Sequence, residues 1–294
     1  MRYLALLILP MLLLTWLPGC TATETADLAA TTLPVYEFST WLCQNTDLTV
    51  ARVVNESVSC LHDYTLRADQ MRTIQGADAV IISGAGLEDF MDDALTGANQ
   101  IIDASQGLSL LDGEGSDHDH GHDHSGHIHE EDPHIWLSPA NAKMMAHNIC
   151  HGLETLYPQH KDVFEKNLKA LALELDALQA FGNEALAELS CRELVTFHDG
   201  FAYFAESFNL KILTAVEEES GSEASAKQLI QLAELVQDHN LPAVFTEMNG
   251  SVSAANVLAA ETGVKIYALD MAMTGNSYFE SMRRNIEIIR EAMQ

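Results

Sequence analysis

Basic residues are scarce in this sequence. Lysine and arginine together number 15 against 43 aspartates and glutamates, which gives a formal net charge of −28 with histidine neutral. Such a surface repels phosphate groups, so the charge argues against nucleic acid as a partner. It favours a cation as ligand, although solubility alone explains the number equally well.

Cysteine is also infrequent, and no two cysteines have the C-x-x-C spacing of many zinc and redox motifs. The chain has five. With Cys20 set aside, the other four are an even number, which favours disulfides in an exported protein. Three pairings are open, and a zinc site made of cysteines is the alternative. We predict the two pairs that the expected fold makes local, Cys43 with Cys60 and Cys150 with Cys191.

Long hydrophobic runs are confined to the start of the chain, and no later run is long and apolar enough to cross a bilayer. Residues 1–19 carry one basic residue, Arg2, before an apolar stretch, which is the plan of a secretory signal. An uncleaved membrane anchor is the alternative. Cys20 follows Gly19 as the lipid-modified cysteine of a bacterial lipoprotein follows a small residue. We therefore predict cleavage after residue 19 and a lipid anchor on Cys20, on the extracytoplasmic side of the membrane.

Strands and helices alternate along the rest of the chain. We expect strands at 48–54, 79–83, 100–103, 193–197, 211–216, 243–246 and 264–269. We expect helices at 37–44, 65–76, 88–95, 140–156, 158–189, 200–208, 224–239, 252–262 and 277–293. This order predicts an α/β fold with two lobes of mostly parallel sheet flanked by helices. The helix at 158–189 is long enough to reach across a domain and join the lobes.

The predicted organisation has five parts. They are a signal peptide at 1–19, a tether at 20–32, an N-terminal α/β lobe at 33–137, a helical connection at 138–189 and a C-terminal α/β lobe at 190–294.

A histidine-rich segment at 113–131 interrupts the N-terminal lobe. Its six histidines are His118, His120, His122, His124, His127 and His129. The segment is acidic, contains glycine and has almost no apolar residues, so it cannot fold alone and is expected to be a mobile surface loop. Imidazole suits zinc, copper and nickel, so the segment predicts a loose metal collector, with a solvated spacer as the alternative.

Four other side chains follow a strand or stand in a loop that leads into a helix: His62, His134, His198 and Asp270. In open α/β sheets ligands bind beyond the carboxyl ends of the strands, so two facing lobes would bring these positions into one cleft. Three imidazoles and a carboxylate are the ligand types of a closed tetrahedral zinc site. Each residue alone has an ordinary explanation, such as a local turn or a helix cap, but together they predict a metal centre.

Several blocks of the sequence resemble the solute-binding lipoproteins of bacterial zinc and manganese ABC importers, and among them the zinc-uptake branch. The blocks are CLHDYTLRADQ, ADAVIISGAGLEDFM, the histidine-rich loop, DPHIWLSP, TFHDGFAYFAESFNL, FTE, ETGVKIYALD and YFESMRRNIEIIREAM. They cover nearly the whole mature chain in the family's order. The resemblance implies two α/β lobes joined by a long backbone helix, with one metal in the cleft. It also implies a monomeric receptor that delivers this metal to a membrane permease.

The resemblance also implies a ligand set. Family ligands carry over to His62, His134 and His198, with Asp270 at the place of an acidic fourth ligand that some members use and others replace by water or another carboxylate. In one family arrangement a glutamate precedes the first histidine, but Leu61 stands there in this chain. Asp270 or water is therefore left for the fourth position.

Glu247 is expected to support the metal site without binding the metal. It follows a predicted strand, and its carboxylate is placed to orient a ligand histidine by accepting the second N–H of the ring. A helix cap or a surface carboxylate is the alternative.

The predicted function is the capture of Zn²⁺ and its delivery to an ABC permease, without catalysis. Manganese is the less favoured metal because it prefers more carboxylate ligands. A zinc-dependent hydrolase is an alternative from another class, but the H-E-x-x-H pair of many such enzymes is missing. An adhesion or metal-buffering lipoprotein, in which the cleft is incidental, is the other alternative.

Overall fold

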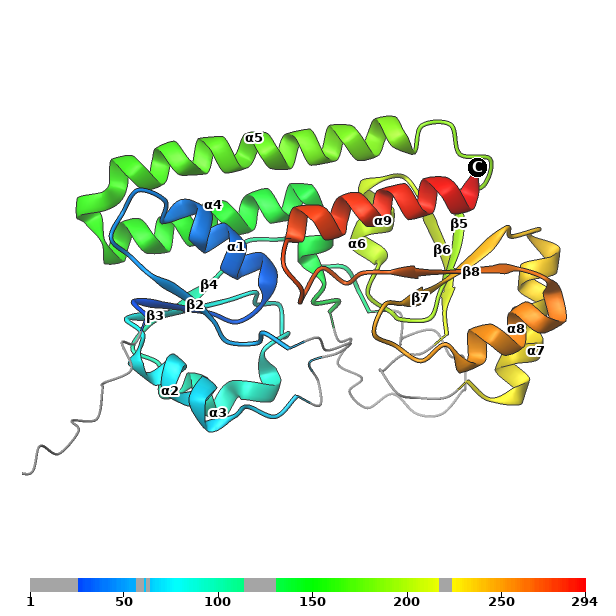
Figure 1. Ribbon diagram of the computed structural model, residues 1–294, viewed down its shortest axis with the longest axis horizontal. Coiled ribbons are helices and arrows are strands. Elements are labelled where there is room, and N and C mark those ends of the chain that lie inside the picture. The colour runs from blue at the N-terminus through cyan, green and yellow to red at the C-terminus, as the bar shows by residue number, and fades with distance from the viewer. Residues whose placement is uncertain (1–25, 57–60, 62–63, 114–130, 217–223) are drawn as a thin grey trace, which may run out of the picture.

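The computed structural model describes residues 26–56, 61, 64–113, 131–216 and 224–294. Within these ranges, no helix combines the length and the apolar character that a membrane span requires. Two four-stranded sheets, each with only parallel pairings, form the centres of two lobes, and helices flank them (Figure 1). The predicted two-lobed α/β fold is confirmed.

The N-terminal lobe is built on a sheet with the strand order β2-β1-β3-β4. Its strands are β1 (Leu28–Ala30), β2 (Val50–Arg52), β3 (Ala79–Ile82) and β4 (Ile101–Asp103). Its helices are α1 (Leu33–Leu42), α2 (Ala68–Gly76), the 3-10 turn η1 (Asp89–Met91) and α3 (Asp92–Leu95).

Strand β1 corrects the predicted tether at 20–32. Leu28, Ala29 and Ala30 are completely buried, and β1 lies between β2 and β3 with Ala29 paired to Ala51 and to Val80. Three consecutive apolar residues after a polar stretch show no alternation from which a strand could be predicted. The folded body therefore begins several residues earlier than the sequence suggests.

The C-terminal lobe is built on a sheet with the strand order β6-β5-β7-β8. Its strands are β5 (Glu193–Thr196), β6 (Lys211–Ala215), β7 (Ala243–Glu247) and β8 (Lys265–Leu269). Its helices are α6 (Ala202–Ser207), α7 (Ala226–Asp238) and α8 (Ser253–Thr262). Because the strands are parallel, their carboxyl ends meet at one edge of the sheet, which is the edge that carries His198, Glu247 and Asp270.

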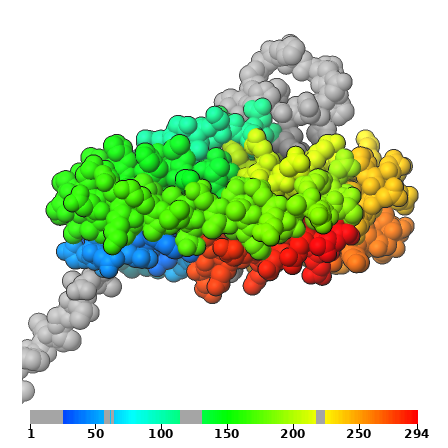
Figure 2. All heavy atoms as spheres, turned by 90° about the horizontal axis from the view of Figure 1, so that it is seen from above, coloured from blue at the N-terminus to red at the C-terminus, as the bar shows by residue number. Residues whose placement is uncertain are grey.

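Long helices connect the lobes along one side of the molecule. They are α4 (Pro139–Leu156), preceded by the 3-10 turn η3 (Ile135–Leu137), then α5 (Lys161–Ala185), preceded by η4 (Pro158–His160), and the last helix α9 (Tyr278–Met293). At 1.5 Å per residue, α5 is about 37 Å long. Figures 1 and 2 show α5 extending over both lobes, with α9 beside it.

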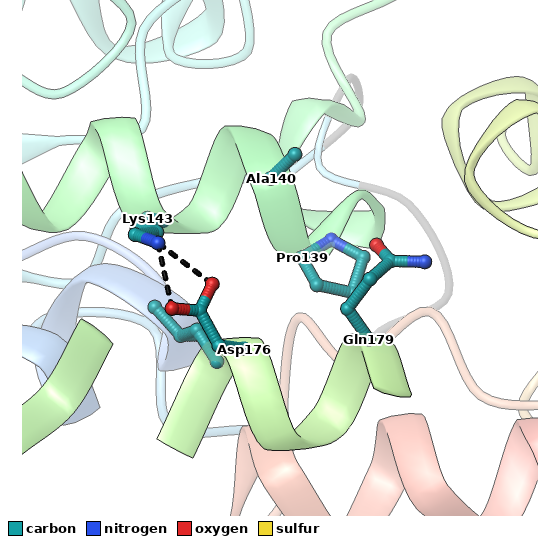
Figure 3. Close-up of a pocket in the computed structure, with 6 residues that line it drawn as sticks. Pro139, Ala140, Lys143, Asp176 and Gln179 are labelled. Carbon is teal, nitrogen blue, oxygen red and sulfur yellow. Dashed lines mark hydrogen bonds and ion pairs between the residues drawn. The ribbon is translucent and has the colours of Figure 1, made fainter. Parts of the chain in front are cut away.

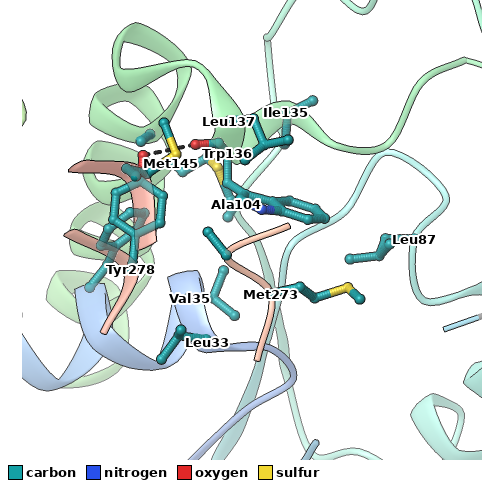
Figure 4. Packing of buried hydrophobic residues seen from close by; sticks show 14 of the residues in the cluster. Leu33, Val35, Leu87, Ala104, Ile135, Trp136, Leu137, Met145, Met273 and Tyr278 are labelled. Atoms are coloured by element: carbon teal, nitrogen blue, oxygen red, sulfur yellow. Dashed lines mark hydrogen bonds between the residues drawn. The ribbon is translucent and has the colours of Figure 1, made fainter. Parts of the chain in front are cut away.

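One hydrophobic core extends from the N-terminal lobe into part of the C-terminal lobe, and a second, smaller core lies within the C-terminal lobe. The Tyr278 hydroxyl donates a hydrogen bond of 2.8 Å to the Trp136 carbonyl, and both side chains are completely buried (Figure 4). Trp136 Nε1 donates to the Met271 carbonyl at 2.8 Å. The Leu33 amide donates to the Met273 carbonyl at 2.9 Å. These bonds fasten the segment after β8, which belongs to the C-terminal lobe, onto the N-terminal lobe.

The predicted Cys150–Cys191 disulfide is not formed, and both residues are free thiols. Cys150 lies in the last two turns of α4 near the start of α5, whereas Cys191 lies beyond the far end of α5. The length of α5 separates the two residues by far more than the roughly 7 Å that a disulfide permits between Cα atoms. Cys43 is also a free thiol, and its predicted partner Cys60 lies outside the described residues. Burial raises the pKa of both Cys43 and Cys150 to about 12.

Candidate metal centre

His198 lies at the carboxyl edge of the C-terminal sheet, two residues after β5. Thr196 pairs with Phe245 of β7, and two further steps along both strands bring His198 level with Glu247. His198 Nδ1 and Glu247 Oε2 are 3.7 Å apart, and both side chains are buried. This distance is too long for a direct hydrogen bond. Glu247 is thus next to the ring that it was expected to orient.

His134 is held in place by a carboxylate that the sequence analysis did not single out. Asp132 Oδ1 accepts a hydrogen bond from the His134 backbone amide at 2.9 Å and lies 2.8 Å from His134 Nδ1. An ionised carboxylate only accepts, so His134 Nδ1 carries a proton, and in the neutral ring Nε2 then keeps its lone pair. Asp132 is 4% exposed. The only signal for Asp132 in the sequence is its place two residues before the candidate ligand His134, which is close enough for a hydrogen bond to the His134 backbone.

The two histidines face each other through the nitrogens that a metal would use. His134 Nε2 and His198 Nε2 are 3.5 Å apart, and their rings stand at 85° with centroids 5.2 Å apart. Two nitrogens bound to one tetrahedral zinc ion at about 2.0–2.1 Å would be about 3.3–3.4 Å apart. The pair therefore has almost the separation that zinc requires.

The charge around this histidine pair also fits a cation. Asp132 Oδ2 is buried and has no hydrogen-bond donor among the described residues. A buried carboxylate oxygen without a donor is costly unless positive charge lies close by. A divalent ion held by His134 would supply that charge.

Asp270 does not join the histidine pair. Its Oδ1 accepts from the Ala272 amide at 2.9 Å, and its Oδ2 accepts from the Ser281 hydroxyl at 2.7 Å. β8 lies beyond β7 as seen from β5, so two strand spacings of about 4.8 Å separate it from the strand of His198. Within the described ranges, no three histidine, cysteine or acidic side chains gather closely enough to hold a metal.

The other predicted ligands lie outside the described residues. They are His62 and the loop histidines His118, His120, His122, His124, His127 and His129. The predicted lipid-attachment residue Cys20 also lies outside the described residues.

Two surface hollows lie elsewhere, and in neither do three metal-ligating side chains of the described residues gather closely enough to hold an ion. One, of about 160 Å³, lies between α4 and α5 (Figure 3). The only metal-ligating side chain among its lining residues is Asp176, whose carboxylate is paired with Lys143 at 2.7 Å. The other, of about 500 Å³, is lined by Cys191, Glu193 and His239, and His239 Nδ1 lies 2.7 Å from Glu193 Oε2.

The fold and these residues define a class of protein. Two parallel α/β lobes bridged by long helices, with buried imidazoles facing each other near the ends of the strands, are the architecture of a two-lobed metal receptor. Residues 28–292 match the family of the periplasmic component A of the zinc-uptake complex, ZnuA. The chain belongs to this family, which confirms the resemblance seen in the sequence. The family consists of solute-binding receptors and not of enzymes.

Individual relatives agree with this assignment. The zinc-binding lipoprotein AdcA of Streptococcus pneumoniae is 30% identical in an alignment that covers 97% of this chain and 60% of AdcA. A crystal structure of ZnuA has a TM-score of 0.79 at 29% identity and covers 92% of this chain and 99% of its own. The Zn(II)-bound ZnuA-like domain of S. pneumoniae AdcA has a TM-score of 0.75 at 27% identity, with coverage of 92% and 99%. The chain thus spans about 60% of AdcA and matches its ZnuA-like domain.

Proposed function

We propose that this protein captures Zn²⁺ outside the cytoplasm and delivers it to the permease of an ABC importer. The single observation that carries the proposal is the 3.5 Å separation of His134 Nε2 and His198 Nε2, two buried nitrogens from different parts of the fold. The relatives named above support zinc, because AdcA is named as zinc-binding and its ZnuA-like domain was crystallised with Zn(II).

The proposed ligands are His62, His134 and His198. Nitrogen-rich sites favour zinc over manganese, which prefers oxygen ligands. Asp270 or water fills the fourth position. The hydrogen bonds that Asp270 accepts from Ser281 and Ala272 favour water, because they hold the carboxylate in place away from the histidine pair.

Glu247 is proposed to act on the metal through His198. A carboxylate beside Nδ1 favours the proton on that atom and leaves Nε2 free to bind the metal. The 3.7 Å contact supports this role, and a small movement of either side chain would make it a hydrogen bond.

The proposal also covers the histidine-rich loop, the lipid anchor and the permease. The loop at 113–131 gathers zinc at lower affinity and passes it to the histidine pair. A lipid on Cys20 holds a monomeric receptor at the outer face of the cytoplasmic membrane, where the permease is reached. Membership of a family of solute-binding receptors supports this location and this partner.

A chelator-competition titration of Zn²⁺ and of Mn²⁺ tests the proposal on protein lacking residues 117–129. We expect one tight zinc equivalent that is lost in His198→Ala and little affinity for manganese. His160→Ala is the matched control, because His160 pairs with Asp47 at the start of the long helix, away from the proposed ligands. Absence of a tight site without the loop would contradict the proposal and would make the protein a loop-based metal buffer.

A further inference from the structure

Gly200 leaves a space that is filled by the two proposed ligands and by one methionine. A Cβ atom placed on Gly200 would lie 2.7 Å from Met271 Cε, 2.8 Å from His198 Cδ2 and 3.0 Å from His134 Cε1. Distances below 3.0 Å are not tolerated between carbon atoms that are not bonded to each other. The Met271 methyl and both imidazole rings therefore surround the same point, and a side chain at position 200 would require Met271 or the rings to shift.

Met271 is fixed in this position by its neighbours. Its carbonyl accepts the indole N–H of Trp136 at 2.8 Å, and its side chain is 4% exposed. The next residue, Ala272, has a left-handed backbone with φ of 53°, and its amide donates to Asp270 Oδ1 at 2.9 Å. A non-glycine residue takes this conformation only where the surroundings enforce it. The turn thus has a defined shape, and Met271 is built into it.

A buried methionine beside two metal-binding imidazoles affects which ion can bind. Zinc accepts four ligands and requires few or no water molecules, whereas manganese and magnesium favour six oxygen ligands, several of them water. An apolar group that occupies one side of the ion removes the room for extra water molecules. The surroundings of a metal site control solvent access in this way.

We propose that Met271 and Gly200 form a size-matched pair that sets the metal selectivity of the site by excluding water next to His134 and His198. Met271 acts by filling space, without a bond from sulfur to the metal. The inference rests on the proposed function, because it concerns selectivity at the same histidine pair.

Single and double variants test the pair, with Zn²⁺ and Mn²⁺ dissociation constants measured by chelator competition on the purified protein. Met271→Ala is expected to lower the ratio of zinc affinity to manganese affinity by at least about tenfold, because it opens room for water. Gly200→Ala is expected to weaken zinc binding by about tenfold or more, because its methyl group forces the rings and Met271 apart. The double variant is expected to recover most of that loss, because Met271→Ala removes the Cε methyl group that a side chain at position 200 would meet.

Two further variants and one spectrum separate this role from a general effect on folding. Met271→Leu keeps an apolar side chain of similar size and should keep the selectivity. Met273→Ala removes a buried methionine of the same segment and should leave the ratio unchanged. One equivalent of Co²⁺ should give the intense visible absorption of four-coordinate cobalt in the unmodified protein and a weaker band in Met271→Ala.

The outcomes distinguish the two levels of the proposal. An unchanged zinc-to-manganese ratio in Met271→Ala, or no recovery in the double variant, would overturn this inference alone. Loss of selectivity in Met271→Leu would also overturn it, because an apolar side chain of similar size would then not be sufficient. Failure of the unmodified protein to bind zinc tightly would instead overturn the proposed function.

Discussion

Asp132 Oδ1 lies 2.8 Å from Nδ1 of His134, and the same oxygen accepts the His134 backbone N–H. The carboxylate therefore fixes both the position of the ring and the proton on Nδ1, so that Nε2 points its lone pair at His198. A carboxylate bound to the far nitrogen of a ligand histidine also makes that ligand more basic. Asp132 therefore preorganises His134 for metal binding.

Asp132→Ala is therefore expected to weaken zinc binding by about 10–100-fold. Asp132→Asn is expected to weaken it less, because an amide oxygen can still accept the Nδ1 proton but carries no charge. Chelator-competition titrations at constant neutral pH measure both. Asp47→Ala is the matched control, since Asp47 also pairs with a histidine, His160, but at an exposed site. Equal affinities for Asp132→Ala and Asp47→Ala would contradict the orienting role.

The positions of His198 and Glu247 at the carboxyl edge of the sheet were predictable from where the strands end. His198 was placed correctly because the strand before it was identified, and parallel strands bring their carboxyl ends together. Asp132 was missed because its role depends on the local turn of the chain at Pro133, which composition does not reveal. The hydrogen bond that the Asp270 side chain accepts from Ser281 was also not predictable, because Ser281 is eleven residues away on α9.

The same limits explain the errors in the fold. Most strands and helices were found because their apolar residues recur with the expected period. Strand β1 has only three residues, all of them buried, so it has no period to detect. The pairing of Cys150 with Cys191 is wrong because the long helix that was predicted between them, observed as α5, carries the chain about 37 Å away from Cys150 before Cys191 is reached.

A buried acid in the N-terminal lobe predicts a pH-dependent stability. Glu88 Oε1 accepts from the Thr31 hydroxyl at 2.6 Å and the Ser83 amide at 2.8 Å, and Oε2 accepts from the Gly84 amide at 3.0 Å. Burial raises the pKa of Glu88 to about 7 although these donors lower it. The folded state thus holds a proton that the unfolded state releases at its ordinary pKa of 4.5.

The sign of the effect follows from this difference in bound protons. The contribution of Glu88 to the free energy of unfolding is fully present below pH 4.5 and is lost as the pH rises to about 7. The loss is at most roughly 3 kcal/mol. Glu88→Gln cannot release a proton, so its stability relative to the unmodified protein should improve as the pH rises from about 5 to about 8. Urea unfolding of the metal-free proteins measures this difference in stability. A difference that does not change with pH would contradict the prediction, and Glu287→Gln is the exposed control.

The first turn of α9 is capped by a residue of the other lobe. Glu37 of α1 accepts from the Tyr278 amide at 2.5 Å and from the Ser277 hydroxyl at 3.1 Å. Glu37→Ala is expected to lower the free energy of unfolding by about 1–2 kcal/mol, because it removes a helix cap and a contact between the lobes. Glu280→Ala, an exposed acid in the same turn of α9, should have a smaller effect. Denaturant titrations compare the two, and equal losses would show that Glu37 contributes only as a negative charge near the helix end.

Asp270 provides the test of the fourth ligand. Its side chain accepts from Ser281 and Ala272, and its backbone amide and carbonyl bond to Asn285, so its first role is to shape the turn that follows β8. Asp270→Asn is therefore expected to lower the thermal unfolding temperature of the metal-free protein. The zinc affinity of Asp270→Asn should fall by less than about tenfold. Removal of a residue that supports a metal ligand typically costs at least about tenfold, so the expected loss is below even that level. Ser281→Ala is the matched control, because it removes one of the same hydrogen bonds and leaves the carboxylate in place. A much larger loss of zinc affinity in Asp270→Asn than in Ser281→Ala would identify the carboxylate as a metal ligand, and the Asp270 side chain would then have to turn from Ser281 toward His198 when zinc binds.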